Sequence, residues 1–167
     1  NQFSRIEAAT TEIKVHQVLD LAEIPTFQAF PTIDADTDGR LSETELAGYM
    51  SDLSNEYLSK LSLTIDGRPL ALSVVKQAIR TNPGEGNLST LRLEWDLVGK
   101  PEAAFSGGRV VFADNNYTER IGWREMIVNG AGLYVYDSNI HSNTLSDELR
   151  AYPQNLLTSP LAEKAAE

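Results

Sequence analysis

The residues best suited to chemistry lie between positions 34 and 45, where an acidic side chain occupies alternate positions and a glycine follows. The segment reads Asp34-Ala35-Asp36-Thr37-Asp38-Gly39-Arg40-Leu41-Ser42-Glu43-Thr44-Glu45. A hard divalent cation such as Ca²⁺ binds six to eight oxygen atoms, which carboxylates and backbone carbonyls supply. Without a counter-ion these carboxylates would repel one another. The spacing therefore predicts a calcium-binding loop.

Every specified position of this segment matches the twelve-residue loop of an EF-hand. The expected ligands are single carboxylate oxygens at positions 1, 3 and 5, a backbone carbonyl at position 7, a water-mediated hydroxyl at position 9 and both carboxylate oxygens at position 12: Asp34, Asp36, Asp38, Arg40, Ser42 and Glu45. Gly39 permits the sharp turn at position 6. The alternative is a solvated acidic turn in which Ser42 caps the following helix.

The segments beside the loop predict one good helix and one short one. After the loop, apolar residues are spaced three or four apart, which predicts a helix from Leu46 to about Leu61. Before it, Pro25 and Pro31 leave room for little more than one turn, so a short helix starting at Pro25 is expected. A single loop without a partner suits a structural role better than a calcium sensor, which opens a pair of helices.

Other candidate sites are weaker. The segment from Asp114 to Glu125 has acidic and amide side chains at suitable positions, but it lacks the glycine and continues as a strand. His16 lies on the polar side of a predicted strand, and His141 lies in a polar stretch without a partner nearby in the sequence. The absence of cysteine excludes thiolate metal sites and thiol catalysis. We therefore predict no catalytic residues and no enzymatic activity.

Most of the chain alternates between apolar and polar residues, as half-buried strands do. The expected strands, with short turns between them, are 12–21, 61–65, 70–74, 91–97, 110–112, 121–128 and 133–136. Gln17 breaks the apolar face of the first of these strands, and Trp95 and Trp123 are expected in the core. The pattern predicts a mostly β protein, an antiparallel, immunoglobulin-like β-sandwich with a single EF-hand-like loop and helix inserted.

The predicted domain spans residues 1–155, with the insertion at about 24–61 and a tail or linker over 156–167. A hairpin is expected at Asp66–Pro69, a second turn at Gly84–Gly86, and a short helix at Ser146–Ala151.

Composition narrows the classes of partner. The 167 residues include 14 basic and 24 acidic side chains, giving a net charge of -10. This balance argues against binding to nucleic acid and against direct adhesion to anionic lipid. No apolar run reaches the roughly 18 residues that cross a bilayer. The sequence starts at Asn1 without a signal peptide, and it reads as part of a longer or processed chain.

Several blocks resemble the extracytoplasmic region that precedes the membrane helices of bacterial nickel/cobalt transporter-like proteins. They cover residues 1–7, 19–28, 121–125, 149–157 and 159–161. The resemblance implies a signal peptide before Asn1, membrane helices of the same parent chain after Glu167, and a periplasmic or cell-surface location. It does not imply nickel binding here, because two separated histidines and no cysteine make a poor nickel site.

Three functions remain open from the sequence. The first is a calcium-binding, non-catalytic accessory domain of a membrane metal transporter-like protein. The second is a free-standing secreted binding or adhesion module with calcium in a structural role. The third is a hydrolase whose site the sequence does not reveal.

Overall fold

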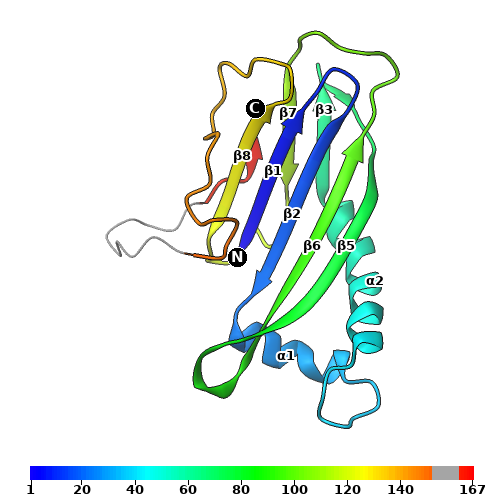
Figure 1. The fold of residues 1–167 in the computed structure, drawn as a ribbon, viewed down its shortest axis with the longest axis vertical. Helices are drawn as coiled ribbons and strands as arrows, with labels where there is room; N and C mark the ends of the chain where they lie inside the picture. Colours follow the sequence, from blue (N-terminus) through cyan, green and yellow to red (C-terminus); the bar gives the residue numbers. More distant parts are fainter. Residues whose placement is uncertain (152–161) are drawn as a thin grey trace.

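The computed structural model describes residues 1–151 and 162–167 and contains two β-sheets and two α-helices in these residues (Figure 1). The larger sheet has five strands in the order β5 (Leu72–Pro83), β6 (Ser89–Gly99), β2 (Ile13–Leu21), β1 (Gln2–Ala8) and β8 (Arg124–Gly130). The smaller sheet has the order β4 (Arg68–Pro69), β3 (Leu61–Ile65), β7 (Val110–Asp114) and β9 (Ala165–Ala166). This mostly β arrangement is consistent with a β-sandwich, as predicted.

One strand pair differs from the expected antiparallel pattern. β1 runs parallel to β8, with Gln2 opposite Arg124, while the other neighbours within each sheet are antiparallel. Antiparallel order is imposed by a tight hairpin. β1 and β8 are separated by most of the chain, so no hairpin constrains their relative direction. The expectation of an entirely antiparallel sandwich is therefore wrong at this edge.

The main core lies on the inner face of the larger sheet. Its buried side chains come from both sheets and from both helices: Ile6, Ile13, Val15, Leu19, Ile33, Leu46, Met50, Tyr57, Leu63, Leu91, Leu93, Trp95, Leu97, Phe112, Met126 and Ala166. Trp95 is fully buried in it, which confirms its predicted place. The outer face carries a second, smaller cluster formed by Phe3, Val18, Ile127 and Leu149. Trp123 is only partly buried, and it packs against this second cluster.

The predicted hairpin at Asp66–Pro69 is correct only over two residues. β3 pairs with β4 through Ile65 opposite Arg68, but the chain then crosses to the other sheet, where β5 pairs with β6. Pro69 has no N–H to continue a ladder, which limits β4 to an edge fragment. The longer β5 instead finds a partner of similar length in β6. The turn predicted at Gly84–Gly86 joins these two strands, and a short 3-10 helix, η1 (Glu85–Asn87), lies within it.

Two predicted elements are absent and a third is shifted. Residues 133–136 form no strand, and Tyr134 and Tyr136 are almost fully exposed. Residues 146–151 form a turn rather than a helix, with φ between +47° and +65° at residues 147–149. A contact with a distant strand explains the turn, because Ser146 is fully buried and its hydroxyl donates a hydrogen bond to the carboxylate of Glu125. β8 begins at Arg124, later than expected, and leaves Ile121 exposed.

The end of the chain is part of the fold. β9 pairs with β7, and Ala166 is buried in the main core. The expectation of a tail over residues 156–167 is therefore wrong for residues 162–167. The rest of that predicted tail lies outside the described residues.

Candidate metal centre

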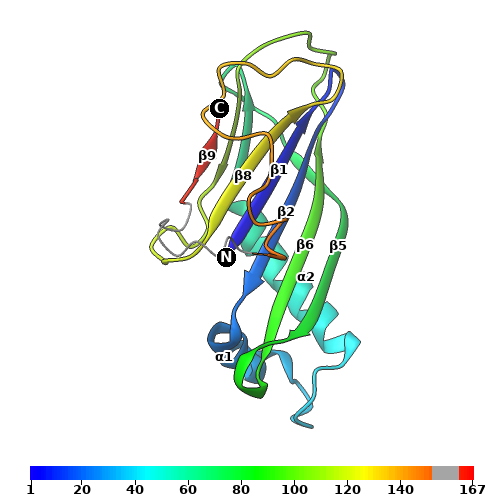
Figure 2. The same ribbon diagram turned by 60° about the vertical axis from the view of Figure 1, so that its left-hand side comes forward.

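The predicted loop lies between two helices at one end of the molecule, beyond the strands of the larger sheet (Figures 1 and 2). The incoming helix, α1 (Glu23–Ile33), has 11 residues and is longer than expected. Pro25 lies in its first turn, where the backbone amide has no acceptor within the helix to lose. Pro31 lies inside the helix, close to its end, and removes only one hydrogen bond. The prediction of a short helix starting at Pro25 is therefore wrong.

The outgoing helix, α2 (Glu43–Ser59), confirms the predicted amphipathic helix with shifted ends. It starts earlier than Leu46 because Ser42 is its N-cap, and it stops before Leu61, which begins β3. The Ser42 hydroxyl accepts a hydrogen bond from the Glu45 amide (3.3 Å), and the Glu45 carboxylate accepts one from the Ser42 amide (2.9 Å). This reciprocal capping box satisfies two amides at the helix start.

Three carboxylates meet within the loop. Asp34, Asp36 and Asp38 each offer an oxygen within 4.8 Å of the others. Backbone amides hold them in place: the amide of Asp38 donates to Asp34 Oδ1 (3.1 Å), and the amide of Gly39 donates to Asp34 Oδ2 (3.0 Å). A carboxylate can accept about four hydrogen bonds, so these contacts leave it capacity for a cation. In residues 1–151 and 162–167 no other group of three or more candidate ligand side chains lies this close together.

The shape of the loop depends on Gly39. Its φ is +79°, a left-handed conformation that a side chain disfavours. Asp34 is buried at the end of α1, whereas Asp36 and Asp38 are exposed. The loop therefore presents two solvent-exposed carboxylates beside one that is buried in the fold.

The remaining predicted ligands flank the three aspartates. Glu45 Oε1 accepts a hydrogen bond from the Ala35 amide (2.8 Å), and Oε2 accepts one from the Ser42 hydroxyl (2.8 Å). The backbone amide and hydroxyl of Ser42 are the main reasons that the pKa of Glu45 is lowered. Arg40 donates its own amide to Asp38 Oδ1 (2.7 Å). The structure thus brings the three aspartate carboxylates together, and the Glu45 carboxylate bonds to residues at both the start and the end of the loop.

The second candidate segment, from Asp114 to Glu125, does not form one site. Asp114 lies in the interior, where burial raises the pKa of its carboxyl. Glu125 is on the outer face of the larger sheet and accepts a hydrogen bond from Trp123 Nε1 (2.9 Å). The two ends of the segment from Asp114 to Glu125 therefore lie on opposite sides of the larger sheet.

The histidines are also apart. His16 Nδ1 lies 2.7 Å from Asp96 Oδ1 on the neighbouring strand, so the imidazole already has a carboxylate partner. His141 is exposed and forms an isolated bridge with Ile127. The two histidines do not contribute to the group of aspartates.

Sequence reasoning missed a buried group that we call the interior polar cluster: Gln2, Gln17, Tyr57, Asp114, Asn116 and Arg124. The amides of Gln2 (2.8 Å) and Gln17 (2.9 Å) donate to Asp114 Oδ2. The one signal in the sequence was Gln17, which interrupts an apolar strand face at an inward position.

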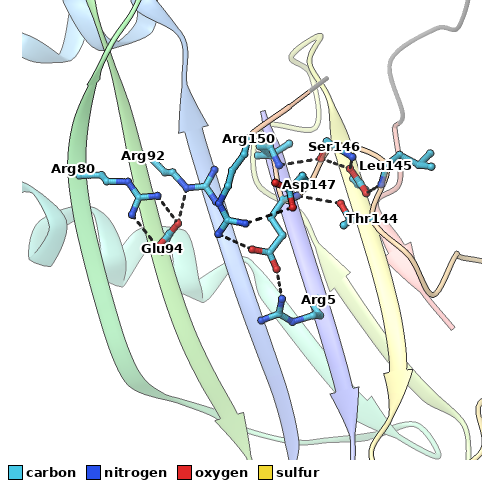
Figure 3. A network of polar contacts seen from close by, with 12 residues as sticks. Arg5, Arg80, Arg92, Glu94, Thr144, Leu145, Ser146, Asp147 and Arg150 are labelled. Carbon is cyan, nitrogen blue, oxygen red and sulfur yellow. Dashed lines mark hydrogen bonds and ion pairs between the residues drawn. The ribbon is translucent and has the colours of Figure 1, made fainter. Parts of the chain in front are cut away.

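The outer face of the larger sheet carries a network of charged side chains (Figure 3). Arg80 and Arg92 both contact Glu94, and Arg5 and Arg150 both contact Glu148. Arg92 Nη2 is sealed from solvent and lacks a hydrogen-bond partner among the described residues. Each of the four arginines already contacts a glutamate, and the free nitrogen of Arg92 is inaccessible, so the network is poorly suited to binding an anion. The contact between Arg5 on β1 and Glu148 instead helps to hold the 144–151 segment against the sheet.

Comparison with known proteins gives no family for this chain. No protein-family model matches it, and no curated protein matches it as a relative. Among the described residues, no helix is both long enough and apolar enough to span a membrane. The chemistry of the site therefore carries the functional inference.

Proposed function

We propose that the chain binds one Ca²⁺ in the loop from Asp34 to Glu45. The observation that supports this most directly is the convergence of three aspartate carboxylates within 4.8 Å on a loop between two helices. Three like charges at this separation repel one another, and a divalent cation relieves that repulsion. The other expected contributions are the Arg40 carbonyl, the Ser42 hydroxyl through water, and both oxygens of Glu45.

Calcium fits this donor set better than other common metals. The candidate donors are all oxygen atoms, which suit hard cations, whereas zinc, nickel and copper prefer sites that include histidine or cysteine. Mg²⁺ requires near-octahedral geometry and keeps several waters, so it is less suited to a loop rich in protein oxygens. On binding, the Glu45 carboxylate would give up its hydrogen bonds with Ala35 and Ser42 and coordinate the cation instead. We further infer that this unit is an EF-hand-like insertion in an immunoglobulin-like sandwich.

A structural role is favoured over a sensor role. Ile33 at the end of α1 and Met50 on α2 are both buried in the main core, so the two helices are anchored to the β-sheets. A sensor must separate its helices to expose an apolar groove. Separating these two would expose the core of the whole domain. Calcium would instead fix the loop together with the end of α1 and the start of α2.

We also infer where the domain is located and what it is attached to. The resemblance to extracytoplasmic regions of nickel/cobalt transporter-like proteins supports a domain outside the cytoplasm that is attached to membrane helices of its parent chain and has no catalytic role of its own. Millimolar calcium outside the cytoplasm would suit a loop of modest affinity. A run of apolar helices following this region in the parent reading frame would support this part, and its absence would favour a free-standing binding module.

Calcium titration by calorimetry and thermal unfolding test the main proposal together. At a free calcium concentration ten times the Kd, the expected stabilisation is about 1.4 kcal/mol, which for a domain of this size raises Tm by roughly 3–6 °C relative to EDTA. The Asp34→Asn variant should lose most of the response, because it removes charge from the one buried carboxylate of the group. No heat of binding together with no change in Tm would overturn the proposal.

A further inference from the structure

The helix α2 connects the aspartate loop to the interior polar cluster. Its buried residues form a single stripe along the helix: Leu46, Met50, Ser54 and Tyr57. Glu45 lies in the first turn of this helix, and Tyr57 lies in its last turn. At 1.5 Å per residue, these two residues are about 18 Å apart along the axis. Figure 1 shows the helix running from the loop alongside the larger sheet.

The second half of α2 is held by directional contacts. Trp95 Nε1 donates a hydrogen bond to the Ser54 hydroxyl (2.8 Å), and the Tyr57 ring stacks on Trp95 with 4.7 Å between centroids and 7° between planes. The Tyr57 hydroxyl accepts hydrogen bonds from the side-chain amides of Gln17 (2.9 Å) and Gln2 (3.2 Å). Buried hydrogen bonds of this kind specify one position and one rotation of the helix, since leaving a partner unsatisfied is costly.

The end of the helix is fixed by the segment that follows β7. Asn116 Nδ2 donates to the carbonyl of Tyr57 (3.0 Å), and the amide of Asn115 donates to the carbonyl of Lys60 (3.1 Å). These bonds satisfy carbonyls that an α-helix leaves without partners at its end. Arg124 in turn donates to the carbonyl of Asn116 (2.6 Å), which links the helix end to β8. Side chains of β1, β2 and β7 thus contact Tyr57 at the far end of the helix that carries Glu45, and β8 is linked to it through Asn116.

We propose that α2 couples occupancy of the calcium loop to the interior polar cluster, so that each stabilises the other; this inference rests on the proposed calcium site. Calcium bound by Glu45 restricts the first turn of the helix, and the cluster restricts its last turn. Both favour the same position of one rigid element. Coupling between two sites is reciprocal, so damage to the cluster weakens calcium binding by the same factor by which calcium stabilises the cluster.

The decisive variant is Tyr57→Phe, which removes the hydroxyl that accepts hydrogen bonds from Gln2 and Gln17. Tyr49→Phe is the matched control, because it makes the same chemical change at a half-buried position of the same helix. Calorimetric titration should show calcium binding weakened about fivefold in Tyr57→Phe. The affinity of Tyr49→Phe should stay within about twofold of the wild type. Equal affinities of the wild type and a folded Tyr57→Phe variant would overturn the inference.

A measurement on the wild-type protein keeps the inference testable if Tyr57→Phe does not fold. The amide of Asn116 donates to Asp114 Oδ1 (2.9 Å) inside the cluster, whereas the amide of Ala131 donates to the carbonyl of Ala8 (2.8 Å) away from it. Calcium should slow hydrogen exchange at Asn116 more than at Ala131. Unchanged exchange at Asn116 while calorimetry detects calcium binding would remove the coupling alone. No calcium binding to the wild type would remove the proposed function and the coupling together.

Discussion

The molecule places aspartates in two contrasting settings, the loop around Asp34, Asp36 and Asp38 and the interior polar cluster around Asp114. In the loop, three carboxylates lie together, two of them exposed, and their hydrogen bonds come from nearby backbone amides. In the cluster, a single carboxylate is almost fully buried and is contacted by the side-chain amides of Gln2 and Gln17 from distant strands and by that of Asn116, two residues further on.

The difference lies in which groups satisfy the charge. Asp114 is surrounded mainly by neutral donors. Burial raises the pKa of its carboxyl, and the hydrogen bonds from Asn116 and the nearby guanidinium of Arg124 offset part of that rise. Such a carboxylate has no need of a cation and holds strands and helix together. Within the described residues, the hydrogen bonds to the loop aspartates come from neutral backbone amides, so their negative charge stays in excess. Metal binding is therefore expected where several carboxylates lie together with few hydrogen-bond donors. A structural role is expected where many donors surround a single carboxylate.

The largest expected effect is that of Asp114→Ala. The change leaves the side-chain amides of Gln2 and Gln17 and the amide of Asn116 without their shared acceptor in the interior. We expect a loss of about 3 kcal/mol in the free energy of unfolding, measured by urea denaturation. Asp36→Ala, measured in EDTA, is the control, and it should change stability little because the side chain is exposed. Similar effects of the two substitutions would contradict the contrast between the two settings.

The second prediction separates the two roles of Glu45. Gln can replace Glu in a capping box, so Glu45→Gln should retain the start of α2 and unfold in EDTA at a temperature close to that of the wild type. It cannot offer two charged oxygens to calcium, so the affinity for calcium should fall roughly ten- to hundredfold. Calorimetry and thermal unfolding measure the two effects. An unchanged affinity would mean that Glu45 serves only as a helix cap and is not a calcium ligand.

Substitutions of Gly39 in the loop and Gly48 in α2 test whether the loop needs the left-handed backbone conformation. An added Cβ would meet no atom within 4 Å at either Gly39 or Gly48, so packing does not distinguish the two positions. Gly39 has φ of +79°, whereas Gly48 lies inside α2. Gly39→Ala should destabilise by about 1 kcal/mol, and Gly48→Ala should stabilise by roughly 0.5–1 kcal/mol. Denaturation in EDTA measures both, and changes of the same sign would be inconsistent with the observed conformations.

Local patterns predicted the elements that local forces determine. The spacing of apolar residues predicted α2 and the alternation around Trp95 predicted β6, because each pattern matches the face that is buried. The spacing of Asp34, Asp36 and Asp38 predicted their convergence, since a short loop with a glycine brings alternate residues together. Helix α1 was underestimated because a proline in the first turn costs little.

Features that depend on distant contacts were not predictable in the same way. The left-handed turn at residues 147–149 follows from the anchoring of Ser146 to Glu125, and no local pattern encodes that pairing. The parallel pairing of β1 with β8 and the return of β9 to the smaller sheet likewise join segments that are far apart in the chain. The interior polar cluster is the clearest case, because Asp114 reads from the sequence as a loop residue.

The smallest expected effect concerns the pH dependence of the cluster. Burial raises the pKa of Asp114 above its usual value of 3.8, so the folded state retains this proton when the unfolded state has lost it. Stability from this group is therefore fully present below pH 3.8 and decreases as the pH rises through the raised pKa. Asp114→Asn cannot ionise and lacks this contribution. Subtracting the unfolding free energy of Asp114→Asn from that of the wild type, both in EDTA, should give a difference that becomes less favourable to the wild type across this interval. A difference that instead grows in favour of the wild type with rising pH would mean that hydrogen bonds to the ionised carboxylate outweigh its burial.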